Sequence, residues 1–114
     1  MIHLRTGIEI AERYAVSPHQ VANAYEATAA IWLDEGNIQR AAVLMAAAEA
    51  LREAIGAGGD RLFADRREHI RTNLATAIPE PERLALTNIG RAMSRDEVRR
   101  FALREYEPTG DLSA

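Results

Sequence analysis

The chain of 114 residues contains no cysteine and no lysine, and aromatic residues make up only 5 % of it. Without cysteine, disulfides, thiolate metal sites and a cysteine nucleophile are excluded. Without lysine, and without a glycine-rich loop that ends in Gly-Lys-Ser/Thr, nucleotide binding through a phosphate loop is excluded. Because aromatics are few, alanine, leucine and isoleucine carry the apolar content, and this composition favours closely packed helices.

The charge balance is mildly acidic, with a net charge of −3 and an isoelectric point of about 5.6. This balance argues against a broad nucleic-acid interface. Charged residues interrupt every apolar stretch near the N-terminus, so neither a signal peptide nor a membrane span is expected there, and a cytoplasmic protein is the default. The content of hydrophobic residues, 47 %, is typical of a globular chain. We expect one helical domain over residues 1–106 and a flexible tail over residues 107–114.

Apolar residues recur at spacings of three and four along nearly the whole chain, which indicates an all-α fold. Turn and cap residues divide the pattern into about six helices. Gly36-Asn37 is typical of a left-handed helix C-cap, and Ser94 with Glu97 is typical of a capping box. The expected helices cover residues 4–15, 18–35, 38–55, 60–78, 81–92 and 95–106.

Four of these helices have inward faces that matter for the packing. The helix over residues 38–55 is apolar on most sides, which predicts a central helix enclosed by its neighbours. For the three helices that follow it, the spacing predicts inward faces made, in chain order, of Phe63, Ile70, Leu74 and Ala77, then Leu84, Ala85, Asn88 and Ile89, then Val98, Phe101, Ala102 and Tyr106.

The pair of helices joined at Gly36 resembles a tetratricopeptide repeat. Large and small residues alternate in the register that such a repeat uses, so that small residues let two helices approach and large ones fill the gaps between neighbouring pairs. The residues that carry this packing pattern are Tyr25, Thr28, Ala29, Trp32, Gly36, Ala41, Met45 and Ala48. The sequence therefore predicts tetratricopeptide-like antiparallel helix pairs in a short right-handed array.

A longer resemblance covers residues 36–57, Gly-Asn-Ile-Gln-Arg-Ala-Ala-Val-Leu-Met-Ala-Ala-Ala-Glu-Ala-Leu-Arg-Glu-Ala-Ile-Gly-Ala, and residues 90–103, Gly-Arg-Ala-Met-Ser-Arg-Asp-Glu-Val-Arg-Arg-Phe-Ala-Leu. Both stretches are similar to the helical region near the C-terminus of bacterial LuxR-type transcriptional regulators with a signal-transduction ATPase, and of the related ATPase-linked adenylate cyclases. The resemblance implies a module that senses or transmits a signal through contacts. The chain departs from the family in having no phosphate loop and no helix-turn-helix after Leu103, so it is expected to be an excised domain or a small free-standing relative.

The residues that could form a metal or catalytic site are explained more simply by structural roles. A metal site needs at least three converging ligands, and His3, His19 and His69 have no histidine or cysteine at ligand spacing on their own helices. Asp65 and His69 share one helical face, which is expected to be solvated. Asp34 and Glu35 stand beside a turn, and neither acid–base catalysis nor a cofactor is expected.

Arginines recur every four residues at Arg91, Arg95 and Arg99. Such a stripe can bind an acidic partner or a phosphate group, although nearby acids are expected to pair with part of it. Tyr25 and Trp32 are also candidates to line a peptide groove, but core packing is the simpler role for both.

Together these features favour a non-catalytic protein–protein interaction module of a bacterial signalling or transcriptional regulator. The apolar central helix predicts a homodimer through the first three helices. The alternative is a ligand-sensing domain that holds a small apolar molecule in an alanine-lined core.

Overall fold

The computed structural model describes residues 18–56 and 64–108. These residues form five helices and no strand: α2 (Pro18–Asp34), α3 (Ile38–Ala54), α4 (Ala64–Ala77), α5 (Glu80–Ala92) and α6 (Arg95–Ala102). The all-α prediction is confirmed, with five helices in this part of the chain in place of about six. The helix expected over residues 4–15, Phe63 and residues 109–114 lie outside the described residues.

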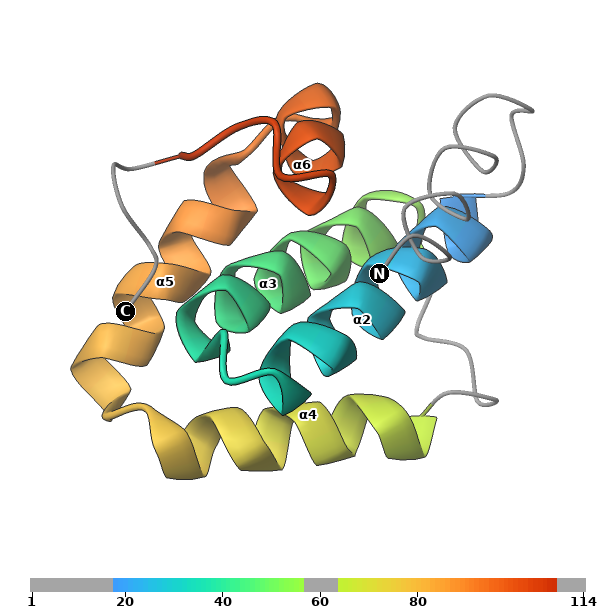
Figure 1. Cartoon of the computed structure of the whole chain (residues 1–114). Coiled ribbons are helices and arrows are strands. Elements are labelled where there is room, and N and C mark those ends of the chain that lie inside the picture. Colours follow the sequence, from blue (N-terminus) through green and yellow to red (C-terminus); the bar gives the residue numbers. More distant parts are fainter. Residues whose placement is uncertain (1–17, 57–63, 109–114) are drawn as a thin grey trace.

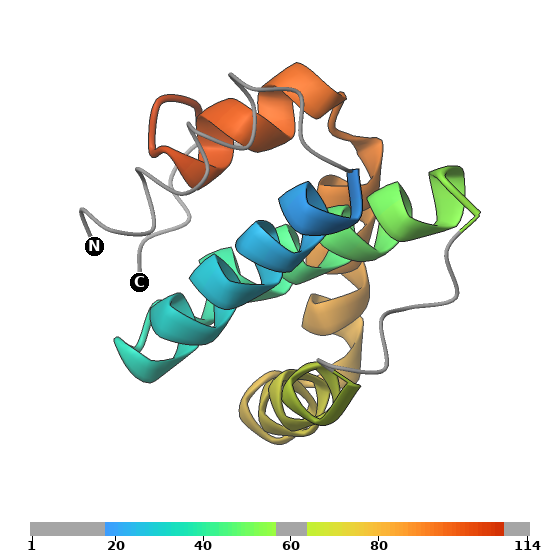
Figure 2. The same ribbon diagram turned by 90° about the vertical axis from the view of Figure 1, so that its right-hand side faces the viewer.

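Helix α3 lies at the centre of the fold, with α2 on one side and α5 on the other (Figure 1). Helix α4 runs below the α2–α3 pair and α6 lies above it, as a second view at right angles also shows (Figure 2). The predicted antiparallel pair is therefore present, and its second helix is the element around which the others pack.

The turn between α2 and α3 follows the cap that the sequence predicts. Gly36 has a φ of 86°, in the left-handed region. The N–H of Gly36 donates to the carbonyl of Leu33 at 3.1 Å, and the N–H of Asn37 donates to the carbonyl of Trp32 at 2.8 Å. This double hydrogen bond is a Schellman motif, which ends the helix and turns the chain back.

Residues 40–48 of α3 are all buried, so no face of this helix is left open along two and a half turns. The predicted enclosure of α3 is confirmed, and it is achieved within a single chain. The homodimer expected through the first three helices stays a prediction, and residues 40–48 of α3 would not supply its interface because they are buried within one chain.

The predicted inward face of α5 is wrong except at Ile89, which packs against the core. Leu86 and Gly90 are buried, while Leu84, Ala85 and Asn88 are exposed. The reason is the close approach of α5 to α3 at Gly90, where a Cβ atom would come within 2.9 Å of the Ala46 Cβ and closer still to the Val43 carbonyl oxygen. Glycine usually destabilises a helix. Here the absence of a side chain at Gly90 allows α5 to pack closely against α3.

Two helix ends also differ from the prediction. On α4, Ile70 and Leu74 are buried as expected, but Ala77 is exposed and Ile78, just past the helix, is buried in its place. Helix α6 ends at Ala102, because Arg104 adopts a φ of 62° and the N–H of Glu105 donates to the Arg100 carbonyl at 2.7 Å. This is again a Schellman ending, here with arginine where glycine is usual, so no residue type predicts that the helix ends before Tyr106.

Candidate interaction surfaces

The residues of the repeat-like packing pattern on α2 and α3 belong to the core. Tyr25, Thr28, Ala29 and Trp32 on α2, and Ala41, Met45 and Ala48 on α3, are all buried. Ala29, Ala41 and Ala48 are 0 % exposed, as expected where two helix backbones approach. Tyr25 and Trp32 are therefore core residues, and neither lines an open groove.

Two arginines flank an aromatic contact between α2 and α6. The ring of Trp32 meets the ring of Phe101 edge to face, with centroids 5.5 Å apart. The guanidinium of Arg104 lies 5.0 Å from the Trp32 centroid, and that of Arg40 lies 5.7 Å from the Phe101 centroid. Arg40 also forms an ion pair with Glu107, so the chain after α6 is tied to the start of α3.

A buried carboxylate, that of Glu26 on α2, is the centre of a charged cluster. Glu26 is 0 % exposed, and Arg52 on α3 is 4 % exposed. Arg52 donates to both carboxylate oxygens of Glu26, with Nε at 2.8 Å from Oε2 and Nη2 at 3.0 Å from Oε1. Such a two-point arginine–carboxylate contact is both directional and strong. It joins the two helices of the pair.

Helix α4 adds two further arginines to this cluster. Nη2 of Arg66 lies 3.8 Å and Nη1 of Arg67 lies 3.7 Å from the Glu26 Oε1. Burial lowers the pKa of Arg66, its attraction to Glu26 raises it, and repulsion from Arg52 and Arg67 lowers it further. The Glu26 carboxylate thus holds α4 to the α2–α3 pair through charge.

This cluster was not predicted from the sequence. One signal was present: Glu26 stands four residues after Ala22 and three before Ala29, so an acid falls inside an apolar stripe. A buried carboxylate needs a cationic partner. Arg52 interrupts the apolar pattern of α3, and it is the cation that pairs with Glu26.

The three arginines of the candidate acidic-partner surface do not form one continuous stripe. Met93 and Ser94 are extended, so Arg91 lies on α5 while Arg95 and Arg99 lie on α6. Arg91 forms two hydrogen bonds with the carboxylate of Glu53 on α3, at 2.7 and 3.0 Å. That contact lowers the pKa of Glu53 and raises the pKa of Arg91. Arg91 is thereby engaged within the fold.

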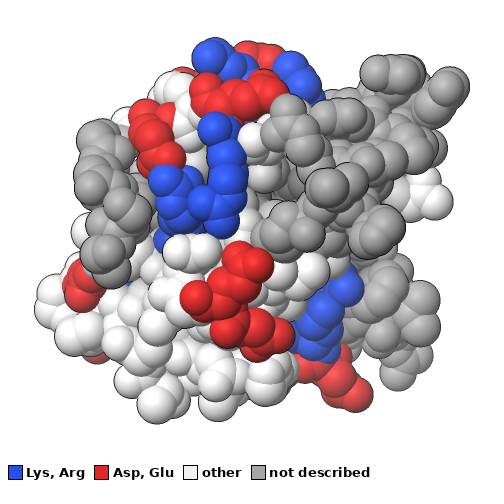
Figure 3. All heavy atoms as spheres, viewed as in Figure 1, with Lys and Arg blue, Asp and Glu red and all other residues white. Residues whose placement is uncertain are grey.

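The other two arginines, Arg95 and Arg99, differ in their ion pairing. Arg99 lies 3.7 Å from a carboxylate oxygen of Asp96 on its own helix. Arg95 is exposed, with no ion pair to any residue in the described ranges. Charges of both signs mix over α6, as Figure 3 shows at the top of the molecule.

The predicted capping box at the start of α6 is confirmed. The N–H of Glu97 donates to the Ser94 hydroxyl at 3.1 Å, and the N–H of Ser94 donates to the Glu97 carboxylate at 2.8 Å. The hydroxyl of Tyr106 donates to the second oxygen of Glu97 at 2.9 Å. These hydrogen bonds, led by the one from the Ser94 backbone, lower the pKa of Glu97, and the bond to Glu97 raises the pKa of Tyr106.

The other candidate sites lie on the surface. Asp34 and Glu35 are exposed at the end of α2, and Asp65 and His69 are exposed on α4. The side chain of Asn73 donates to the His69 carbonyl at 2.8 Å. In the part of the chain that the structure covers, no three histidine or acidic side chains are grouped as metal ligands would be. His19 is exposed at the start of α2, and His3 lies outside the described residues.

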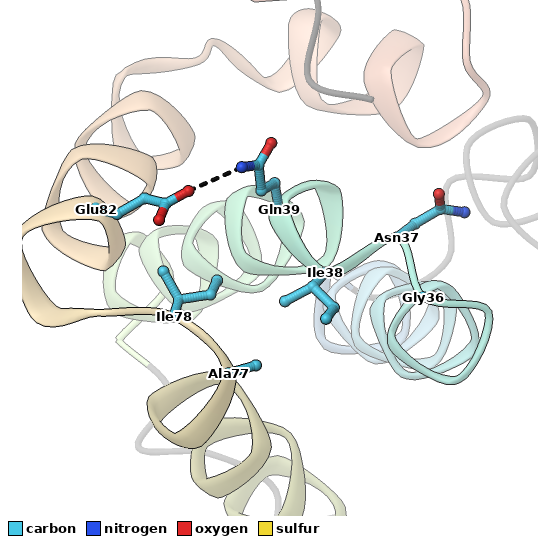
Figure 4. A pocket seen from close by; sticks show the side chains of 7 residues that line it. All are labelled: Gly36, Asn37, Ile38, Gln39, Ala77, Ile78 and Glu82. Carbon is cyan, nitrogen blue, oxygen red and sulfur yellow. Dashed lines mark hydrogen bonds between the residues drawn. The ribbon is translucent and has the colours of Figure 1, made fainter. Parts of the chain in front are cut away.

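A shallow pocket of about 180 Å³ lies where the α2–α3 turn, the end of α4 and the first turn of α5 meet (Figure 4). Its walls come from two stretches far apart in the sequence, residues 36–39 and 77–82, with Ile38 and Ile78 on its apolar side and Gln39 and Glu82 at its polar edge. Gln39 Nε2 donates to Glu82 Oε1 at 2.8 Å. The pocket is at the surface and not in the alanine-rich core.

Among the described helices, none combines the length and the apolar character that crossing a membrane would require. Comparison with protein-family models, with curated proteins and with solved structures gives no match for this chain.

Proposed function

We propose that this chain is a non-catalytic protein–protein interaction module, acting in a bacterial signalling or transcriptional regulator in the cytoplasm. In this proposal the helical scaffold presents a surface to a protein partner and needs no cofactor or nucleotide. The regulator context comes from the resemblance of residues 36–57 and 90–103 to the helical region of LuxR-type regulators and ATPase-linked adenylate cyclases.

The observation that carries the proposal is the packing of the α2–α3 pair. All the residues of the repeat-like pattern on these two helices are buried, and Gly36 makes the tight turn between them. Repeats of helix pairs form binding surfaces from the outer sides of a rigid stack. We take α2–α3 as one such pair, with α5 and α6 as its neighbours in a short right-handed array.

The polar chemistry of the described core also supports a scaffold. Glu26 and Arg52 bind each other between helices, and Arg91 and Glu53 join α5 to α3. Groups engaged in this way hold helices in place and are not available to act on a substrate.

Affinity capture tests the proposal. The purified chain is immobilised as bait for a lysate of the organism that encodes it, beside a Glu26→Ala bait whose fold is weakened by an unpaired arginine cluster. We expect at least one protein to be retained by the folded chain and not by the variant, at a reproducible ratio. If the two baits retain the same proteins in equal amounts, the chain is not an interaction module.

A second copy of the chain is one partner that the proposal includes, because the sequence predicts a homodimer. Light scattering coupled to size exclusion, over a concentration series, tests it. The mass of a dimer is the expected result, and the mass of a monomer at every concentration contradicts it. Since α3 is covered within one chain, a dimer would form through the outer helices.

The alternative, an apolar-ligand sensor, has less support. The described core is filled by side chains such as Trp32, Leu44 and Phe101, which are at most 1 % exposed. The pocket between the turns has a volume of about 180 Å³, below the range of about 300–1,000 Å³ that small-molecule sites occupy. A ligand-dependent rise in Tm would favour this alternative.

A further inference from the structure

The pocket between the turns combines apolar walls with a carboxylate at its edge. The side chains of Ile38, Ala77 and Ile78 form the apolar part, and Glu82 stands across from them (Figure 4). One oxygen of Glu82 accepts the hydrogen bond from Gln39. Its other oxygen has no partner among the described residues. The volume, about 180 Å³, suits one amino-acid side chain.

The acids around this pocket differ from most other acids of the fold in having no arginine partner. Six carboxylates in the described ranges have an arginine within ion-pair distance, namely Glu26, Glu49, Glu53, Glu68, Asp96 and Glu107. Besides Asp65, four exposed acids in these ranges have no such partner: Asp34, Glu35, Glu80 and Glu82. Each of them lines the pocket or stands within two residues of a residue that does. Asp65, at the start of α4, is a further unpaired acid, and it lies away from this pocket.

The nearest arginine in sequence does not neutralise these acids. Arg83 directs its Nη1 at the carbonyl oxygens of Ile78 and Ala75, at 2.9 and 3.4 Å, where it caps the end of α4. The surface over the corner between α4 and α5 is otherwise largely uncharged (Figure 3). Arg83 is thus bound to backbone carbonyls, and it forms no ion pair with Glu80 or Glu82.

Two of the four acids also oppose the helix dipole. Asp34 is in the last turn of α2, Glu35 follows it, and that turn contains no basic residue. Negative charges at a helix C-terminus are unfavourable. Glu80 and Glu82 are in the first turn of α5, where the dipole stabilises them. The dipole gives no such stabilisation to Asp34 and Glu35. Acids in an unfavourable position are expected where a partner supplies the opposite charge.

We infer that this pocket binds an arginine or lysine side chain from a basic segment of a protein partner. The aliphatic stem of the incoming side chain lies between Ile38 and Ile78, as long cationic side chains do on apolar surface. Its cationic head pairs with the free oxygen of Glu82, and Asp34, Glu35 and Glu80 attract the rest of the segment. The same negative charge repels nucleic acid. This inference rests on the proposed function, because it names the surface and the partner's chemistry.

Titration by NMR with small probes tests the inference on the intact chain. The probe is N-acetyl-arginine amide, and its control is N-acetyl-citrulline amide, which has the same shape without the charge. We expect saturable amide shifts confined to residues 36–39 and 77–82, with the citrulline probe about fivefold weaker, the upper end for one exposed ion pair. Shifts that are absent, spread over the molecule, or equal for both probes would overturn the inference.

Two matched variants complete the test. Glu82→Gln keeps an acceptor for Gln39 and removes the charge, so the arginine probe is expected to bind it no more tightly than the citrulline probe binds the wild type. Asp65→Asn removes an unpaired exposed acid away from the pocket, and it is expected to leave the affinity unchanged. An equal loss in both variants would show a general charge effect and would overturn the assignment to the pocket.

The outcome for the pocket is separable from the outcome for the proposed function. A Glu82→Gln bait that retains the captured partner as well as the wild type does would overturn the pocket and leave the interaction module standing. Wild-type bait that retains no more than the Glu26→Ala bait would overturn the module. If the wild-type bait retains the partner and the Glu82→Gln bait does not, the result supports both the pocket and the interaction module.

Discussion

Trp32 on α2 and Phe101 on α6 meet edge to face, with ring planes at 88° and centroids 5.5 Å apart. Both side chains are almost completely buried. The contact brings together residues that are 69 positions apart in the chain. It links α6 to the central pair through apolar contact, so the packing of α6 is expected to depend on it.

Replacement of Phe101 tests this dependence. Phe101→Ala removes a ring that is 0 % exposed, and we expect a loss of about 3–5 kcal/mol in the free energy of unfolding. Urea unfolding measures the loss, and because Trp32 is the chain's one tryptophan, its fluorescence reports the same contact. The matched control is Leu84→Ala, at a side chain that is 56 % exposed, with an expected change within about 0.5 kcal/mol. Equal losses in the two variants would contradict the burial of Phe101.

Loss of the Glu26 carboxylate is expected to destabilise the fold strongly. Glu26→Ala leaves Arg52, which is 4 % exposed, without its buried counter-charge, and removal of one partner of a buried pair costs about 3–5 kcal/mol. Urea unfolding gives the value. Glu68→Ala is the control, because Glu68 is exposed and the variant loses only an ion pair of 3.8 Å with Arg71. A cost below about 1 kcal/mol for Glu26→Ala would show that the cluster is not buried as described.

A methyl group at position 90 is expected to push α5 away from α3. Gly90→Ala would normally stabilise a helix by roughly 0.5–1 kcal/mol, but here its Cβ would meet the Ala46 Cβ at 2.9 Å and the Ala47 nitrogen at 3.1 Å. We expect a net loss of at least about 1 kcal/mol from overpacking. Asn88→Ala, on the exposed face of the same helix, is the control and is expected to be neutral or slightly stabilising. A stabilising Gly90→Ala would show that the two helices do not approach at this residue.

The pH dependence of stability tests the hydrogen bonds of Glu97. The folded-state pKa of Glu97 lies below its ordinary value of 4.5, so its contribution is present above that pH and is lost as the pH falls through the lowered pKa. The pKa of Tyr106 lies above its ordinary value of 10.0, so the shared hydrogen bond is lost again as the pH rises through that raised pKa. We expect the difference in Tm between the wild type and Glu97→Gln to be largest between these limits. A difference that is constant with pH would contradict the shifts.

The sequence predicted the features that depend on local pattern. The all-α class, the turn at Gly36, the capping box of Ser94 and Glu97, and the enclosure of α3 all follow from residue spacing or from a cap motif a few residues long. The repeat-like register placed Tyr25, Trp32, Met45 and their alanine neighbours in the core for the same reason.

The features that were missed depend on contacts between distant elements. The inward face of α5 is set by where Gly90 meets α3, and no periodicity within α5 records that. The end of α6 depends on Arg104 in a left-handed conformation that its residue type does not signal. The Glu26 cluster joins side chains from three helices. The pocket also needs two distant stretches, residues 36–39 and 77–82, to meet in space.

The most direct test of the central claim is the affinity of the purified chain for the protein recovered by capture, measured by isothermal titration calorimetry. An interaction module predicts saturable binding with a Kd of about 1 μM or tighter, weakened in Glu26→Ala together with the fold. Heats of dilution alone, with a wild-type chain shown to be folded, would contradict the claim that this helical chain works by binding a protein.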